Sequence, residues 1–220
     1  MITVHHLEKS RSTRVLWALE ELEVPYEIVT YARNPKTMLA PPELKKVHPL
    51  GKSPVLTDED RTLAESGAIL EYLVERYGKG NLVPPAGSDE RLRYTRWMHY
   101  AEGSAMSPLL LKLVFETVKR KTPWPVKPIA KAIADKVLAD FVHPQITTHF
   151  DHIESELGKS TWFAGETFTA ADIQMSYPIE AYASRMMVSP HPNISKYLER
   201  IHVRAAYRKA IEKGGPVTLS

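Results

Sequence analysis

The sequence predicts a protein of two domains: a mixed α/β domain with the element order β-α-β-α-β-β-α over residues 1–78, and an all-helical domain over residues 89–220. Three observations support this division. Short runs rich in β-branched residues alternate with helical apolar spacing in the first 78 residues. Residues 79–88 are rich in glycine and proline and form a linker. The periodic segments after residue 88 have the spacing of helices.

The first three elements form a β-α-β unit. Ile2–Leu7 is short and rich in β-branched residues, which favours a strand. After the polar residues 8–12, apolar side chains recur at helical spacing up to Leu22. Pro25 disfavours continuation of that helix, so Tyr26–Tyr31 is predicted as the second strand.

A β-hairpin and a helix complete the first domain. Before them, Pro35, Pro41 and Pro42 interrupt a stretch in which we expect only a turn or two of helix. Residues 53–57 are predicted as a strand, residues 58–60 as a turn and Arg61–Ala64 as the return strand. From Glu65, apolar residues recur at helical spacing until Gly78, where we expect a left-handed cap.

The second domain is predicted to be helical throughout. Trp97, Tyr100, Ala101 and Ser104 share one helical face. Further helical segments are expected at residues 129–157, 170–187 and 194–211. Pro144 and Pro178 are expected to start or kink helices. The chain shows no internal repeat.

The composition narrows the function classes. The 220 residues are 43% hydrophobic, and 29 basic against 26 acidic residues leave a net charge of +3, dispersed along the chain, so no nucleic-acid partner is expected. The chain has no cysteine, which excludes disulfides, thiolate metal sites and a thiol nucleophile of its own. We see neither a secretory signal nor a membrane span, and we expect a cytoplasmic protein. His5 and His6 point to opposite faces of a strand, so we expect no metal site.

One stretch carries a family resemblance. Residues 48–73 read HPLGKSPVLTDEDRTLAESGAILEYL. They resemble the pattern G-K-x-P-x-L, a hairpin, then E-S-x-A-I-x-x-Y-L of the cytosolic glutathione S-transferases, in the serine-type branch of fungi and bacteria. The resemblance extends along essentially the whole chain and is specific in the first domain and at residues 169–172. It implies that the first domain has a thioredoxin-like fold.

The resemblance implies that glutathione binds at the start of the helix that follows the hairpin. Backbone N–H groups there lack intrahelical partners and the helix dipole is positive, so Ser66 can hold the γ-glutamyl carboxylate with its hydroxyl and amide. Glu65 would face the ammonium group. Without the resemblance, both would be ordinary residues of a first helical turn.

The rest of the tripeptide is expected beside the loop before the hairpin. In the family, the residue before a cis proline pairs its backbone with the cysteinyl part of glutathione, and here these are Ser53 and Pro54. Lys52 is placed to meet the glycyl carboxylate, and His48 is a second candidate for the same end. Alternatively, Lys52 is a solvated surface lysine and Pro54 starts an edge strand.

Catalysis in this family means stabilising the glutathione thiolate, which is the nucleophile. The resemblance assigns the hydroxyl donor to Ser10, between the first strand and the first helix. Arg11 is a second catalytic candidate because a cation lowers the pKa of a thiol. Ser10 and Ser12 are also plausible helix caps, and the sequence leaves open whether the hydroxyl or the guanidinium dominates.

Two further assignments concern the helical domain. The pocket for the electrophile is expected between the Ser10 loop and the first long helix of this domain, lined by Gly103, Ser104, Met106 and Ser107. Thr169 and Asp172 have the spacing of a capping box, which the family uses for folding, so we expect Asp172 to be structural.

The resemblance therefore implies a homodimeric detoxification enzyme that transfers the sulfur of its co-substrate glutathione to the alkyl or aryl group of a small hydrophobic electrophile, with no permanently bound cofactor. One alternative is glutathione-dependent reduction of a peroxide by the same thiolate. An alternative of another class is a non-catalytic scaffold for binding or interaction. Such scaffolds often lose the glutathione contacts, whereas the residues expected to make them are present here.

Overall fold

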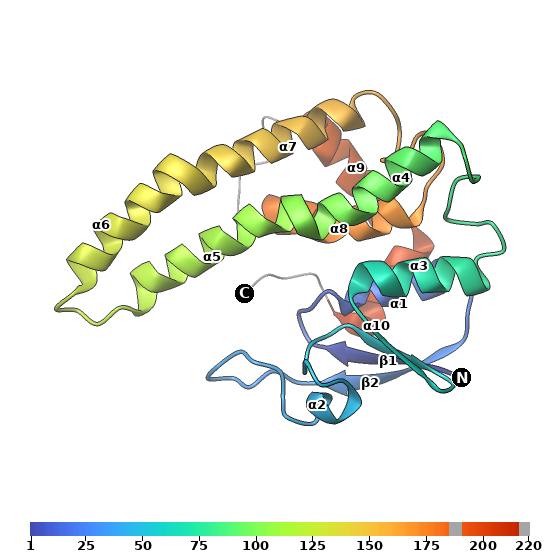
Figure 1. The fold of residues 1–220 in the computed structure, drawn as a ribbon, viewed down its shortest axis with the longest axis horizontal. Helices are drawn as coiled ribbons and strands as arrows, with labels where there is room; N and C mark the ends of the chain where they lie inside the picture. Colours follow the sequence, from blue (N-terminus) through green and yellow to red (C-terminus); the bar gives the residue numbers. More distant parts are fainter. Residues whose placement is uncertain (185–190, 216–220) are drawn as a thin grey trace.

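The computed structural model describes residues 1–184 and 191–215, and Figure 1 shows the fold. The first domain contains, in chain order, β1 (Ile2–Leu7), α1 (Ser12–Glu21), β2 (Tyr26–Tyr31), α2 (Leu44–Val47), β3 (Val55–Asp58), β4 (Arg61–Ala64) and α3 (Ser66–Tyr77). This order is the one that the sequence predicts.

The four strands form one sheet with the order β2-β1-β3-β4. β1 pairs in parallel with β2, with Val4 opposite Ile28, and antiparallel with β3, with Val4 opposite Leu56. The parallel pair needs a crossover, and α1 supplies it as a helix that is buried on all sides from Ser12 to Leu19. The peptide bond between Ser53 and Pro54 is cis. The expected thioredoxin-like arrangement is confirmed.

The second domain is helical, as predicted. Its elements are α4 (Asp89–Tyr100), the π-helix η1 (Ala101–Ala105), α5 (Met106–Lys121), α6 (Lys127–Val137), the π-helix η2 (Leu138–Val142), α7 (His143–Leu157), α8 (Ala170–Ala183), α9 (Pro192–His202) and α10 (Ala205–Gly214). Figure 1 shows α5 and α6 extending together away from the first domain.

Three predicted helical segments differ in detail from the structure. Segment 129–157 is interrupted by η2, and segment 194–211 is divided into α9 and α10. Segment 170–187 ends at Ala183, and its residues 185–187 lie outside the described part. Pro144 lies in the first turn of α7, directly after His143, whereas Pro178 lies inside α8.

α8 forms the centre of the packing between the two domains. Nearly all of its side chains are buried, which is the pattern of a helix covered on every side. It contacts α4 and α9 of its own domain and α1 and α3 of the first domain. Residues of both domains therefore belong to one continuous hydrophobic core.

Gly78 does not form the expected left-handed cap. Its φ is −72°, in the right-handed helical region, and positive φ values occur after it at Lys79 and Gly80. A Cβ at Gly78 would lie 2.3 Å from the carbonyl oxygen of Val74. Glycine is needed here because the backbone packs closely against the preceding turn.

The capping box at the start of α8 is present, in agreement with the structural role expected for Asp172. The carboxylate of Asp172 accepts hydrogen bonds from the Thr169 backbone N–H at 2.8 Å and the Thr169 hydroxyl at 3.0 Å. It also accepts the backbone N–H of Phe163 at 2.9 Å. The box therefore fixes the preceding loop as well as the helix end.

We expect Asp172→Ala to lower the free energy of unfolding by about 3 kcal/mol, because two buried N–H groups lose their acceptor. Chemical denaturation measures the change. Asp140→Ala is the control, since that exposed carboxylate pairs with Lys136 along a helix surface and its loss costs at most about 0.5 kcal/mol. Equal effects of the two substitutions would contradict a structural role for the box.

Candidate active site

Three segments converge beside the carboxyl end of β1. The loop after β1 carries Ser10, and the segment before β3 carries Ser53. The hydroxyl oxygens of these two serines lie 3.4 Å apart. The backbone N–H of Leu7 donates to the Ser53 hydroxyl at 3.2 Å, which fixes the two segments side by side. The predicted catalytic and cysteinyl-binding residues are thus brought together.

The start of α3 provides the third segment. Ser66 is 4% exposed and begins this helix of 12 residues. The N–H groups of its first turn lack intrahelical partners, and the helix dipole makes this end positive. Glu65 precedes the helix with a φ of 71°, in the left-handed region that side chains other than glycine rarely adopt, and its side chain is exposed.

A buried arginine that the sequence analysis did not single out joins α3 to the rest of the site. The guanidinium of Arg14 donates to the Ser66 hydroxyl at 2.8 Å, to the backbone oxygen of Gln174 at 2.7 Å and to the Glu102 carboxylate at 2.5 Å. Its side chain is 1% exposed. In the sequence, Arg14 is a charged residue that directly precedes the apolar residues recurring at helical spacing in α1. This position is the signal by which it could have been found.

Glu102 also binds the second predicted catalytic residue. Both of its carboxylate oxygens lie 3.1 Å from Nε of Arg11. Burial opposes ionisation of Glu102, but the charges and hydrogen bonds of Arg14 and Arg11 outweigh it and lower its pKa. The two guanidinium groups lie over the ring of Tyr177, at 5.1 and 5.2 Å from its centroid. One carboxylate thus serves two guanidinium groups, so Glu102 offsets only part of the positive charge of Arg11.

Ser10 is buried, with 6% of its surface exposed. Its hydroxyl lies 2.7 Å from that of Ser12 and also accepts the backbone N–H of Ser12 at 3.2 Å. This second bond resembles a capping interaction, although Arg11 is the residue that directly precedes α1. Ser10 thus supports the helix start and faces Ser53 at the same time.

The two residues expected at the glycyl end lie on the loop before β3. Lys52 is exposed and directly precedes Ser53. His48 is half-buried, and its Nδ1 accepts the backbone N–H of Leu50 at 3.4 Å. The lysine is available to a ligand, whereas the imidazole is partly used by its own loop.

The residues expected to line the electrophile pocket occupy η1 and the start of α5. Gly103 and Ser107 are exposed, Ser104 is half-buried and Met106 belongs to the hydrophobic core. The Ser107 hydroxyl donates to the backbone oxygen of Gly103 at 3.2 Å. A Cβ at Gly103 would have no atom within 4 Å, so there is open space beside this residue.

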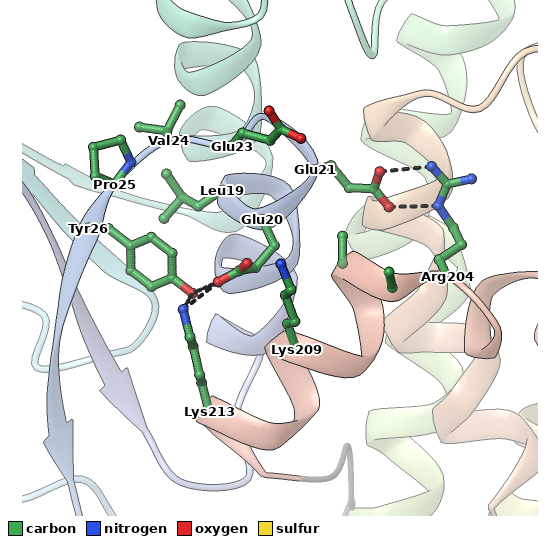
Figure 2. A pocket seen from close by; sticks show the side chains of 12 residues that line it. Leu19, Glu20, Glu21, Glu23, Val24, Pro25, Tyr26, Arg204, Lys209 and Lys213 are labelled. Atoms are coloured by element: carbon green, nitrogen blue, oxygen red, sulfur yellow. Dashed lines mark hydrogen bonds and ion pairs between the residues drawn. The ribbon is translucent and has the colours of Figure 1, made fainter.

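A separate pocket lies at the other end of α1, between the start of β2 and α10 (Figure 2). Four of its charged side chains form ion pairs. Arg204 binds Glu21 at 2.6 and 2.8 Å, and Lys213 binds Glu20 at 2.5 Å and the Tyr26 hydroxyl at 3.2 Å. This pocket holds none of the predicted site residues, and its ion pairs fasten α10 to the first domain.

Neither a metal cluster nor a membrane helix is found in residues 1–184 and 191–215. No group of three or more His, Cys, Asp or Glu side chains in this part could hold a metal ion. None of its helices is both long and apolar enough to span a bilayer. As predicted, His5 and His6 face apart: His5 contacts the Tyr31 hydroxyl at 3.0 Å, and His6 contacts Ser12.

Comparison with known proteins gives consistent matches. Residues 1–75 match the family described as "Glutathione S-transferase, N-terminal domain", and residues 108–204 match "Glutathione S-transferase, C-terminal domain". Glutathione S-transferase 3 of Schizosaccharomyces pombe is 39% identical, over 100% of this chain and 90% of its own length. Glutathione S-transferase 1 of Saccharomyces cerevisiae is 34% identical, over 97% of this chain and 95% of its own length. A crystal structure of a glutathione S-transferase from Actinobacillus pleuropneumoniae has a TM-score of 0.78 and 35% identity, over 97% of this chain and 93% of that one.

The Arg14–Glu102 pair makes stability depend on pH. Glu102 has a lowered pKa in the folded protein, so its charge stabilises the fold above the ordinary glutamate pKa, and this contribution is lost as pH falls through the folded value. We expect Glu102→Gln to reduce the free energy of unfolding by roughly 2 kcal/mol at neutral pH, because the buried Arg14 loses its counter-charge.

Chemical denaturation of both proteins at a series of pH values tests this expectation. The difference between wild type and Glu102→Gln should shrink as the pH falls below about 4.5. Glu116→Gln, at an exposed site paired with Lys119, is the control and should change little. A difference that persists undiminished into acid would contradict the assigned role of the charge.

Proposed function

Because the chain belongs to the glutathione S-transferase family, we propose that it is a cytoplasmic enzyme that activates glutathione beside Ser10 and transfers its sulfur to a small hydrophobic electrophile. The observation that carries this proposal is the convergence of three serines from three separate segments. Ser10 and Ser53 are in contact, and Arg14 of α1 binds Ser66 at the start of α3.

The tripeptide has one anionic end at each side of this site and its thiol between them. The γ-glutamyl carboxylate binds at Ser66, where free N–H groups and the helix dipole favour an anion. The ammonium group faces the exposed carboxylate of Glu65. The cysteinyl backbone pairs with Ser53 beside the cis Pro54, and the exposed Lys52 meets the glycyl carboxylate.

The hydroxyl of Ser10, rather than the guanidinium of Arg11, is proposed as the main group that stabilises the thiolate. A cation lowers a thiol pKa through its net field, and here Glu102, 3.1 Å from Arg11, cancels part of that field. A hydrogen bond to the charged sulfur is not cancelled in this way. This assignment decides between the two candidates that the sequence leaves open.

The electrophile is proposed to bind between the Ser10 loop and the start of α5. The open space beside Gly103 supports this position, since a substrate needs room next to the sulfur. Ser104 directly follows Gly103, Ser107 lies one helical turn further on, and the nearby Met106 belongs to the core. The exposed face of this helix then determines which electrophiles fit.

We expect Ser10→Ala to raise the pKa of enzyme-bound glutathione and to reduce kcat/KM for a model electrophile about 100-fold at neutral pH, because the thiolate loses its hydrogen-bond donor. Arg11→Ala should cost less than about tenfold, since Glu102 already offsets part of the guanidinium charge. The ultraviolet absorbance of the thiolate against pH gives the pKa of the bound thiol.

Ser195→Ala serves as the control, because that hydroxyl bonds within α9 away from the site. A larger effect of Arg11→Ala than of Ser10→Ala would reverse the assignment of the activating group. If wild-type protein binds no glutathione, the transferase proposal fails and a non-catalytic scaffold takes its place.

We further propose that two copies of the chain associate through the outer face of α5 and α6. Exposed apolar side chains recur at helical spacing along both helices, namely Leu110, Leu111, Val114 and Val118 on α5 and Ile129 and Ile133 on α6. A soluble monomer rarely exposes so many large apolar groups together on adjacent helices. The family resemblance implies a homodimer, and this face supplies the apolar surface that one requires.

We expect wild-type protein to have twice the mass of the 24.9 kDa chain in light scattering, and Val114→Glu to shift it towards one chain, because a charge would be buried at the interface. Val203→Glu, at a site 64% exposed between α9 and α10, should leave the mass unchanged. A wild-type mass of one chain would refute the dimer.

A further inference from the structure

Ser10 is the outer end of a buried hydrogen-bonded chain. Its hydroxyl oxygen lies 2.7 Å from that of Ser12, and the Ser12 oxygen lies 2.7 Å from Nδ1 of His6. Ser12 is fully buried and His6 is 2% exposed. Both distances lie within the range of good hydrogen bonds, so the hydrogen-bonded chain is continuous from Ser10 to the imidazole.

The direction of donation along these hydrogen bonds depends on whether Nδ1 of His6 carries a proton. Each hydroxyl carries one proton. When Nδ1 of His6 is unprotonated, Ser12 must donate to it, and Ser10 must then donate to Ser12. Under that condition the Ser10 oxygen presents only lone pairs to the site. When Nδ1 carries a proton, both hydroxyls reverse, and Ser10 donates into the site instead.

The neighbouring Ser53 does not determine the direction in which the Ser10 hydroxyl donates. Ser53 gives its own proton to the backbone oxygen of His5 at 3.0 Å, and it accepts the backbone N–H of Leu7. Its 3.4 Å contact with Ser10 is much longer than the bond between Ser10 and Ser12. Ser12 is therefore the preferred hydrogen-bond partner of the Ser10 hydroxyl.

The imidazole is held in place by elements on both sides. Gly214, the last residue of α10, packs so closely that a Cβ there would lie 3.1 Å from Cε1 of His6 and 2.7 Å from Cδ1 of Leu16 on α1. Lys213 fastens this end of α10 through Glu20 and Tyr26, as Figure 2 shows. The close packing of Gly214 therefore helps to hold the ring beside Ser12.

The neutral imidazole has a nitrogen that can accept a proton, although burial makes the ring a weaker base. Burial lowers the pKa of His6, and the backbone of Gly214 and the charge of Glu8 oppose this only in part. At neutral pH the ring is therefore neutral and has one nitrogen free of a proton. Glu8, on the loop after β1, is the nearby charged group that would stabilise the protonated ring.

We propose that Ser10, Ser12 and His6 form a proton relay that carries the thiol proton of bound glutathione to the buried imidazole. This inference rests on the proposed function. The S–H bond breaks and its proton goes to the Ser10 oxygen, the Ser10 proton goes to Ser12, and the Ser12 proton goes to Nδ1 of His6. The sulfur keeps the electron pair as a thiolate, and the imidazole becomes an imidazolium.

The same transfer reverses both hydroxyls, so that Ser10 ends as a donor to the newly formed thiolate. Acceptance of the proton and stabilisation of the anion thus occur in a single rearrangement of the chain. Ser12 and His6 act through Ser10 and are positioning residues. A lone hydroxyl donor at Ser10 would need neither of them.

The test measures the pKa of enzyme-bound glutathione from thiolate absorbance in wild type, Ser12→Ala and His6→Asn. An asparagine amide can still bond to Ser12 but takes up no proton. Both variants should raise the thiol pKa by about one unit, with kcat/KM falling about tenfold below that pKa and the affinity for glutathione unchanged. The matched control is His5→Asn, the adjacent histidine on the opposite face of β1, which should retain the wild-type thiol pKa.

A second measurement uses only the wild type. The rate of thiolate formation is followed by stopped flow in mixtures of light and heavy water, and several protons moving together give a curved dependence on the deuterium fraction. A linear dependence, or folded variants with the wild-type thiol pKa, would overturn the relay while leaving the transferase intact. Failure of the proposed function is distinct: the wild type itself would then show no lowered thiol pKa.

Discussion

The arrangement of the site depends on the burial of one guanidinium group, that of Arg14. Removing a charge of this kind from water costs several kcal/mol, which is recovered only where its donors meet well-placed acceptors. The acceptors here come from α3, η1 and α8, so the same side chain that requires compensation also fixes the relative positions of three helices. An arginine suits this position because its planar fork can reach partners in several directions at once.

The division of charge around Arg14 also bears on the proposed activation of the thiol. Glu102 serves two guanidinium groups, and its carboxylate keeps the net charge beside Ser10 near one. In the proposed mechanism the sulfur is stabilised mainly by hydroxyl groups whose proton positions are set by their neighbours. The serine hydroxyls that lie within hydrogen-bonding distance at the carboxyl end of β1 support this proposal.

The sequence predicts much of the fold and the outer parts of the site. The bounds of β1, β2 and β4 are confirmed because β-branched runs, Pro25 and the hairpin are local signals. The π-helices η1 and η2 and the cap at Gly78 were not foreseen, since each depends on packing between segments. Likewise, Arg14 and Glu102 are 88 residues apart, and neither position reveals the other without the fold. The hydrogen-bonded chain from Ser10 through Ser12 to His6 is equally hidden in the sequence, because it joins β1 to the start of α1.

The position of Glu102 limits how the two domains can evolve. The helical domain supplies the surface that is proposed to face the electrophile, and several of its side chains around η1 are exposed. Glu102 is different, because it lies in the second domain but neutralises an arginine of the first. A helical domain taken from a relative could replace this one only if it brought an acidic side chain to the same place. Substrate range can therefore diversify by substitution within this domain more readily than by exchange of the whole domain.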